Sequence, residues 1–246
     1  MEDLRDSDVN RMAYYIRTEN RVVRMEVISK LIGAVAPGVC LLAYFYLKDQ
    51  LKPEPFKLVI KVFIIGGLVV FPLIVVQSIL APYNGGIWIE SFLLSGLFEE
   101  FIKWFLLYFL IYNHTEFDEF FDGIVYAVAI AAGFATVENL FYVILGNGNE
   151  FSVIWTRALL PVSGHVLFGI TMGYYFAKMK NNPKIRYYIL SILLPACFHG
   201  VFNLMNHLEM PFGRGLLITF MSFLWWFNIR KMNLSIGKGA VGLAEK

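Results

Sequence analysis

The sequence has few charged residues and few cysteines, and both shortages exclude common classes of protein. Only 16% of its 246 residues are charged, whereas 58% are hydrophobic. A soluble domain is about a quarter charged and about half apolar. The net charge of +2 predicts no nucleic-acid partner. Cys40 and Cys197 both lie in apolar runs, without the spacing of a metal site or a disulfide framework, and we expect both to be small core residues.

Several catalytic and targeting motifs are also missing. No H-E-x-x-H is present, which excludes the common zincin pattern, and no G-x-S-x-G surrounds Ser95 or Ser163. We therefore do not expect a serine nucleophile. The chain also shows no cleavable signal peptide and no internal repeat of the kind found in many transporters.

Long apolar runs fill most of the chain instead. A helix needs roughly 20 residues to cross ~30 Å of hydrocarbon. The runs predict an all-α, polytopic membrane helix bundle with about seven transmembrane helices. The expected spans are residues 28–47, 58–80, 87–112, 122–145, 155–177, 187–208 and 210–229.

Charge divides the chain into three parts. Residues 1–24 are dense in charges of both signs, and we interpret them as a charged tail or an appended segment. Residues 25–231 form the expected membrane-embedded domain, and residues 232–246 form a C-terminal tail.

Basic residues predict the orientation. They gather in residues 48–57, 178–186 and 230–231, which lie on one side of the membrane if there are seven spans. Because basic loops remain in the cytoplasm, we expect a multi-pass protein with a cytoplasmic C-terminus. The arginines of residues 1–24 contradict this rule, which is a further reason to separate them from the membrane domain.

Ionisable and amide side chains occur inside four of the expected spans, although each is costly in a bilayer. They are Glu99, Glu100, Lys103, Glu138, Asn139, His165, His199 and Asn203. Helical spacing lets Lys103 pair with either glutamate, and it puts His199 and Asn203 on one face. Glu99 and Glu100 lie about 100° apart around the helix axis, so they cannot have the same role. We expect the whole set to converge on one water-containing cavity.

Glutamate and histidine in such a cavity are suited to hydrolysis. A carboxylate beside histidine can accept a proton from water and pass it to a leaving amine. A second histidine and an asparagine can stabilise an oxyanion. We therefore predict catalytic roles for Glu99, Glu100, His165 and His199. Supporting roles are predicted for Lys103, Glu138, Asn139 and Asn203.

Three other hypotheses remain open at this stage. Two histidines and a glutamate could instead bind zinc, with metal-bound water as the nucleophile. A proton-coupled transporter could use the same groups as a relay. A non-catalytic scaffold could bind a single-span partner.

The stretch HTEFDEFFD, residues 114–122, contains four acidic residues and one histidine. Metal binding is one interpretation of this composition. A solvated acidic loop that leads to the turn at Asp122-Gly123 is the simpler one.

The chain resembles the PrsW family of membrane-embedded proteases of Gram-positive bacteria, from about Met25 to Lys231. The likeness rests on APGVCLLAYFYLKDQ, EEFIKWF, FDGIVYA, GFATVENLFY, RALLPVSGH, FHG and FLWWF. That family is similar to the CAAX-processing and bacteriocin-processing membrane proteases. Those proteases share a paired-glutamate motif followed by a basic residue, and later histidines that include H-x-x-x-N. The matching residues here are Glu99, Glu100, Lys103, His165, His199 and Asn203. Pro161 departs from the phenylalanine that the wider superfamily often has four residues before the first of these histidines.

The resemblance implies a function in a bacterial cell membrane. Such a protease makes the first cut, on the extracytoplasmic side, in a single-span anti-sigma factor under envelope stress. A second intramembrane protease then completes release of the sigma factor. The expected partners are thus that substrate and membrane lipid. The PrsW family is often labelled a metalloprotease, but its relatives imply a glutamate-type mechanism, so we expect no metal cofactor.

Overall fold

The computed structural model describes residues 2–49, 52–83, 85–145, 158–208 and 212–244. These residues form helices and short connections without any strand, so the all-α prediction is confirmed. The α-helices are α1 (Glu2–Lys48), α2 (Phe56–Leu68), α3 (Val70–Leu80), α4 (Phe98–Ile111), α5 (Asp122–Leu145), α7 (Ser163–Asn181), α8 (Ile185–Asn206) and α9 (Phe212–Ala244). The 3-10 helix η1 (Ala81–Tyr83) and the π-helices η2 (Ile89–Leu97) and η3 (Ala158–Val162) complete the described elements.

The expected count of about seven membrane spans is supported only in part. Among the described residues, four helices are long and apolar enough to cross a membrane: Arg17–Lys48, Phe56–Leu80, Asp122–Ile144 and Ile185–Asn206. The expected span 87–112 is divided between η2 and α4 and carries several buried charges. The expected span 155–177 begins outside the described residues, and the next helix there starts with the π-turns of η3.

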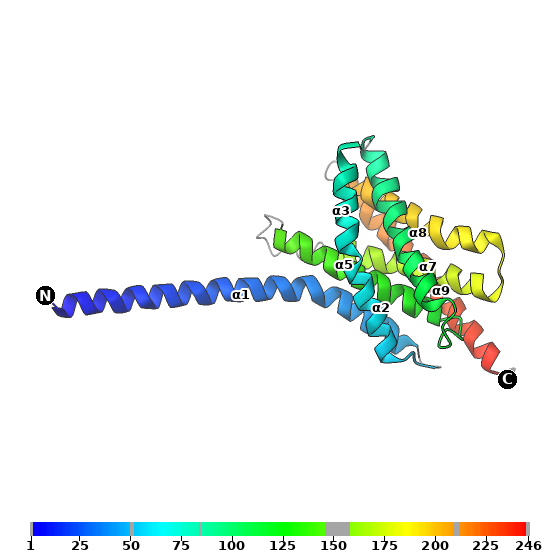
Figure 1. Ribbon diagram of the computed structural model, residues 1–246, viewed down its shortest axis with the longest axis horizontal. Coiled ribbons are helices and arrows are strands. Elements are labelled where there is room, and N and C mark those ends of the chain that lie inside the picture. The colour runs from blue at the N-terminus through cyan, green and yellow to red at the C-terminus, as the bar shows by residue number, and fades with distance from the viewer. Residues whose placement is uncertain (1, 50–51, 84, 146–157, 209–211, 245–246) are drawn as a thin grey trace.

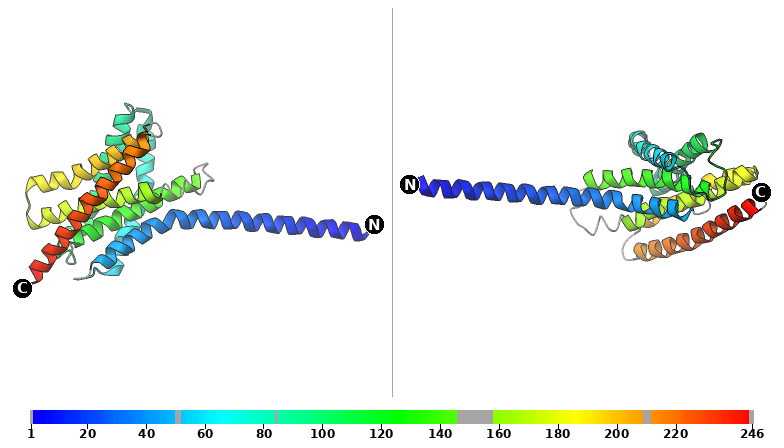
Figure 2. Two further views of the ribbon diagram at one scale, coloured as in Figure 1. Left: turned by 180° about the vertical axis from the view of Figure 1, so that it is seen from behind. Right: turned by 90° about the horizontal axis from the view of Figure 1, so that it is seen from below.

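The N-terminal part of helix α1 projects from the bundle as a long rod, whereas its C-terminal part packs against α5, and the two ends of the chain lie at opposite ends of the molecule (Figure 1). The charged segment therefore continues into the first apolar run without a break. Pro37 lies inside this helix, where its missing N–H and its ring favour a bend. Helix α9 lies along the outside of the bundle, against α7 and α8 (Figure 2).

Helix α5 forms the centre of the bundle and packs on α2 and α7. Small residues at the contacts let these helices approach each other closely. A Cβ added to Gly133 of α5 would lie 1.9 Å from the carbonyl oxygen of Phe63 in α2. A Cβ added to Gly173 of α7 would lie 2.2 Å from the carbonyl oxygen of Gly123. Side chains at these positions would clash with backbone. The small-residue run of α5 thus lets three helices approach closely.

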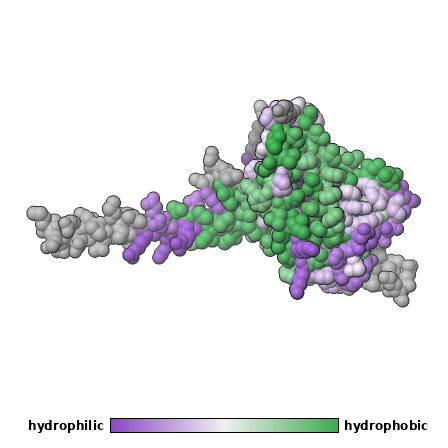
Figure 3. Space-filling view, in the orientation of Figure 1, coloured by the Kyte–Doolittle hydropathy of each residue, from purple (hydrophilic) through white to green (hydrophobic). Residues whose placement is uncertain are grey.

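The outer surface is apolar. Phe109, for example, has 77% of its surface exposed. Hydrophobic residues cover most of the visible face, and hydrophilic residues gather on the projecting part of α1 and near the connection between α7 and α8 (Figure 3). The expectation that Cys40 and Cys197 are core residues is wrong, because both thiols lie on this exposed surface. An apolar run in a membrane helix has a lipid-facing side as well as a core-facing side.

The interpretation of residues 114–122 as a solvated loop is wrong for four of its residues, because Phe117, Phe120, Phe121 and Asp122 are buried. Asp122 is fully buried at the start of α5, where it meets Asp49 and Glu54 from the connection between α1 and α2. We call these three residues the acidic cluster. The reason is local, because Asp122 Oδ2 accepts hydrogen bonds from the backbone N–H groups of Asp118, at 3.0 Å, and Glu119, at 2.5 Å. The aspartate therefore caps the turn from inside.

Candidate active site

Two π-helical segments lead directly into the predicted site residues. Helix η2 ends at Leu97, two residues before Glu99, and η3 ends at Val162, three residues before His165. Pro161 lies within η3, where its missing N–H interrupts the ordinary helical hydrogen bonds. π-Turns inside helices are frequently found at functional sites.

Glu100 lies at the centre of a buried network. Its Oε1 atom is 2.6 Å from Lys103 Nζ and 3.0 Å from Nδ1 of His199. All three side chains are almost completely shielded from solvent. Because an ionised carboxylate can only accept, His199 donates through Nδ1, and its Nε2 atom keeps a free lone pair.

His165 is held at both ring nitrogens. Its Nε2 lies 2.7 Å from Glu138 Oε2, and its Nδ1 lies 2.9 Å from Lys103 Nζ. The ammonium can only donate, so Nδ1 accepts and Nε2 carries the proton toward Glu138. Lys103 also lies over the ring of Phe134, at 4.0 Å from its centroid. The lysine thus joins Glu100 to His165.

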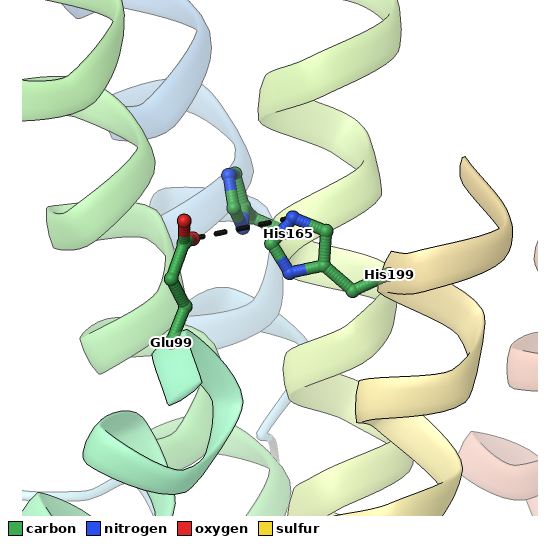
Figure 4. Close-up of side chains that lie close together, drawn as sticks. All are labelled: Glu99, His165 and His199. Carbon is green, nitrogen blue, oxygen red and sulfur yellow. Dashed lines mark ion pairs between the residues drawn. The ribbon is translucent and has the colours of Figure 1, made fainter. Parts of the chain in front are cut away.

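Glu99 also points toward His165 and His199, and it approaches His199 at the other ring nitrogen, Nε2 (Figure 4). Its Oε1 accepts a hydrogen bond of 3.0 Å from Gln77 Nε2. Its Oε2 is buried without a hydrogen-bond partner among the described residues and lies 4.0 Å from His199 Nε2. Two acceptor atoms therefore face each other across a gap that suits a bridging donor or cation. The expectation that adjacent glutamates differ in role agrees with this arrangement.

A cavity of about 880 Å³ opens onto this group. Glu99, Glu138, His165, His199 and Asn203 line it, together with Gln77. Of the paired glutamates only the first is on the cavity wall, since Glu100 lies behind it.

Two further polar residues lie near the site: Asn139, which the sequence predicted, and Gln77, which it did not. Asn139 is turned away from the cavity wall, because its Nδ2 donates to the carbonyl oxygen of Ala34 in α1, at 3.1 Å. Gln77 was not predicted from the sequence. Gln77 and the adjacent Ser78 are the two polar residues of the otherwise apolar helix α3, and a polar pair inside an apolar run was the available signal.

The donor set of this cavity fits zinc. One ligand atom each from Glu99, His165 and His199 lies within 4.8 Å of the others, and one glutamate with two histidines is a known catalytic zinc set. The contact of Glu138 with His165 matches the carboxylate that commonly orients a zinc-bound histidine.

Glutamates and histidines from α4, α5, α7 and α8 gather at a cavity among apolar helices, and all of them except the partly exposed Glu138 are buried. They define a membrane-embedded hydrolase site. Residues 54–227 match the family model described as PrsW family intramembrane metalloprotease. The chain belongs to this family and is a peptidase. The transporter and scaffold hypotheses therefore give way to an enzyme.

Named relatives support the same assignment. The chain is similar to Protease PrsW of Geobacillus kaustophilus, at 45% identity over 85% of this chain and 93% of that protein. It is also similar to Protease PrsW of Bacillus subtilis, at 42% identity over 81% of this chain and 92% of that protein. Protease PrsW of Clostridioides difficile is 32% identical over 81% of this chain and 88% of that protein. No solved structure matches the chain.

Proposed function

We propose that this peptidase makes the first, extracytoplasmic-side cut in a single-span anti-sigma factor, as a multi-pass protein of a bacterial cell membrane. The resemblance to the PrsW family supplies the substrate class. The position of the cavity supports the side of the cut. Glu138 lies late in α5, His165 early in α7 and His199 late in α8, away from the basic segment 178–186 that joins α7 to α8. Basic connections remain cytoplasmic, which also gives the cytoplasmic C-terminus.

The observation that carries the mechanism is the facing pair of acceptors, Glu99 Oε2 and His199 Nε2, 4.0 Å apart. A water molecule that donates to both atoms is positioned to lose a proton to the carboxylate and attack a peptide carbonyl. Glu99 then delivers the proton to the leaving amine. Asn203, on the cavity wall, is the proposed donor to the oxyanion. Glu100 and Lys103 hold His199 and His165 in place.

Zinc-dependent hydrolysis is the second candidate. It is favoured by the donor set and by the description of the family as metalloproteases. Glu99, His165 and His199 would hold the ion, which supplies Lewis acidity and a more acidic bound water. Glu138 would then orient His165, and Lys103 would remain paired with Glu100.

The substrate proposal is tested by reconstituting the protein with a single-span anti-sigma factor in liposomes. Mass spectrometry of the products locates the cut, and Glu99→Gln serves as the inactive control. We expect cleavage near the extracytoplasmic end of the substrate helix. Cleavage at the cytoplasmic end, or undiminished cleavage by Glu99→Gln, contradicts the proposal.

A separate measurement tests whether the peptidase activity requires zinc. Zinc is quantified in purified active protein, and activity is followed during chelation. Full activity without stoichiometric metal supports water activation by Glu99. One zinc per chain, with loss of activity on chelation and recovery on readdition, supports the second candidate.

A further inference from the structure

A second group of buried acids, the acidic cluster, is separate from the catalytic cavity. It consists of Asp49 and Glu54, which flank the connection between α1 and α2, and Asp122 at the start of α5. One carboxylate oxygen of each lies within 4.8 Å of the others. Asp122 and Glu138 share helix α5 and are separated along it by about 16 residues, or about 24 Å. The cluster therefore cannot share a ligand with Glu99, His165 and His199.

The cluster carries more acceptor atoms than donors. Asp49 Oδ2 and Asp122 Oδ1 are buried without a hydrogen-bond partner among the described residues. The exposed fractions of these two residues are 4% and 0%. The hydroxyl of Tyr126 donates to Glu54 Oε2 and supplies one donor. An unpaired buried acceptor is costly, and two beside a third carboxylate are more so.

The two nearby lysines make their direct contacts outside the cluster. Lys52 forms its ion pair with the exposed carboxylate of Asp118. Lys180 donates to the carbonyl oxygen of Phe117, at 2.6 Å. Among the described residues, no basic nitrogen lies within 4.0 Å of a carboxylate oxygen of Asp49, Glu54 or Asp122.

We propose that Asp49, Glu54 and Asp122 bind one hard divalent cation, calcium or magnesium. Carboxylate oxygens are the ligands that both ions prefer, and waters complete their coordination. The two partnerless oxygens, Asp49 Oδ2 and Asp122 Oδ1, become ligands, which removes the cost of burying them. The ion ties the connection between α1 and α2 to the first turn of α5. Its role is structural, and it stabilises the end of the bundle opposite to the catalytic cavity.

The test uses the full-length protein in detergent after removal of metals with a chelator. Calcium and magnesium are titrated separately, and the thermal midpoint is followed by tryptophan fluorescence. At about 100 times the dissociation constant we expect the midpoint to rise by about 5–10 °C, as for a ligand that binds only the folded state. Isothermal titration should give one ion per chain.

Matched variants assign the ion to this cluster. Asp122→Asn and Glu54→Gln should abolish the rise in midpoint. Asp118→Asn, an equal change of charge at the exposed residue four positions away, should retain it. Glu99→Gln should also retain it, because that residue belongs to the other site.

Several outcomes would overturn the proposal. The first is a wild-type midpoint unchanged by both ions, which means that the carboxylates are neutralised by shared protons. An equal rise in Glu54→Gln, or loss of the rise in Glu99→Gln, places the ion elsewhere. If Asp122→Asn does not fold, Glu54→Gln and the stoichiometry of the wild type decide the matter.

Discussion

Replacing Glu99 and Glu100 by glutamine, one at a time, should separate chemistry from stability. Glu99→Gln keeps an oxygen that can accept from Gln77, and it removes a carboxylate that no lysine contacts closely, since Lys103 Nζ is 4.0 Å from Oε2. Glu100→Gln leaves the buried ammonium of Lys103 without its 2.6 Å partner. Losing one partner of a buried ion pair costs about 3–5 kcal/mol. For a chain of this size we expect a fall of about 6–20 °C in the thermal midpoint.

The loss of cleavage activity in Glu99→Gln should not be accompanied by a loss of stability. If Glu99 is the base, Glu99→Gln should lower the cleavage rate about 10²–10⁴-fold, with a midpoint close to that of the wild type. Both quantities are measured on the same detergent preparations, with a fluorogenic single-span substrate and a thermal melt. The reasoning is refuted if Glu100→Gln melts like the wild type, or if Glu99→Gln is the less stable of the two.

Three further predictions follow from other contacts. Gln77→Leu removes the donor to the carboxylate on the cavity wall, at a cost of about 1 kcal/mol, and should lower the cleavage rate several-fold with little change in melting; an unchanged rate would contradict its positioning role. Gly133→Ala should prevent stable folding, whereas Gly215→Ala, which has nothing within 4 Å of the added Cβ, should melt like the wild type. Burial, the largest cause, raises the pKa of Asp49 to about 6 and that of Glu54 to about 9. The folded state then binds more protons than the unfolded state between the ordinary and the raised pKa values, so in the presence of a chelator the free energy of unfolding should fall as pH rises from about 4 to about 9, and a rise would contradict the buried positions.

The sequence predicted the helical class and the convergence of Glu99, Glu100, His165 and His199. In lipid, a long apolar run can form only a helix or a strand of a closed barrel. The runs of this sequence lack the alternation of apolar and polar residues that barrel strands have, so they form helices. Ionisable residues in such runs are costly, so they must meet one another. The same reasoning reached Lys103, because its spacing from both glutamates is fixed by the helix itself.

The sequence did not predict which way several side chains face, because this depends on how the helices pack. Periodicity does not say which face of a lipid-embedded helix meets lipid, so the exposure of Cys40 and Cys197 was predicted wrongly. Composition does not say which acid in a charged loop turns inward, so Asp122 was taken as solvated. The contact of Gln77 with Glu99 joins two different helices, α3 and α4. The rotation of each helix about its own axis is fixed only when the helices pack, so the sequence does not show that these two side chains meet.

The sequence by itself determined the class of the protein, its family and the set of reactive side chains, because helical spacing and membrane cost act locally along the chain. Only the tertiary structure decided which glutamate faces the cavity, which residue holds each histidine, and that Asp49, Glu54 and Asp122 come together. Those facts depend on the rotation and close approach of packed helices, which small residues such as Gly133 permit but do not encode.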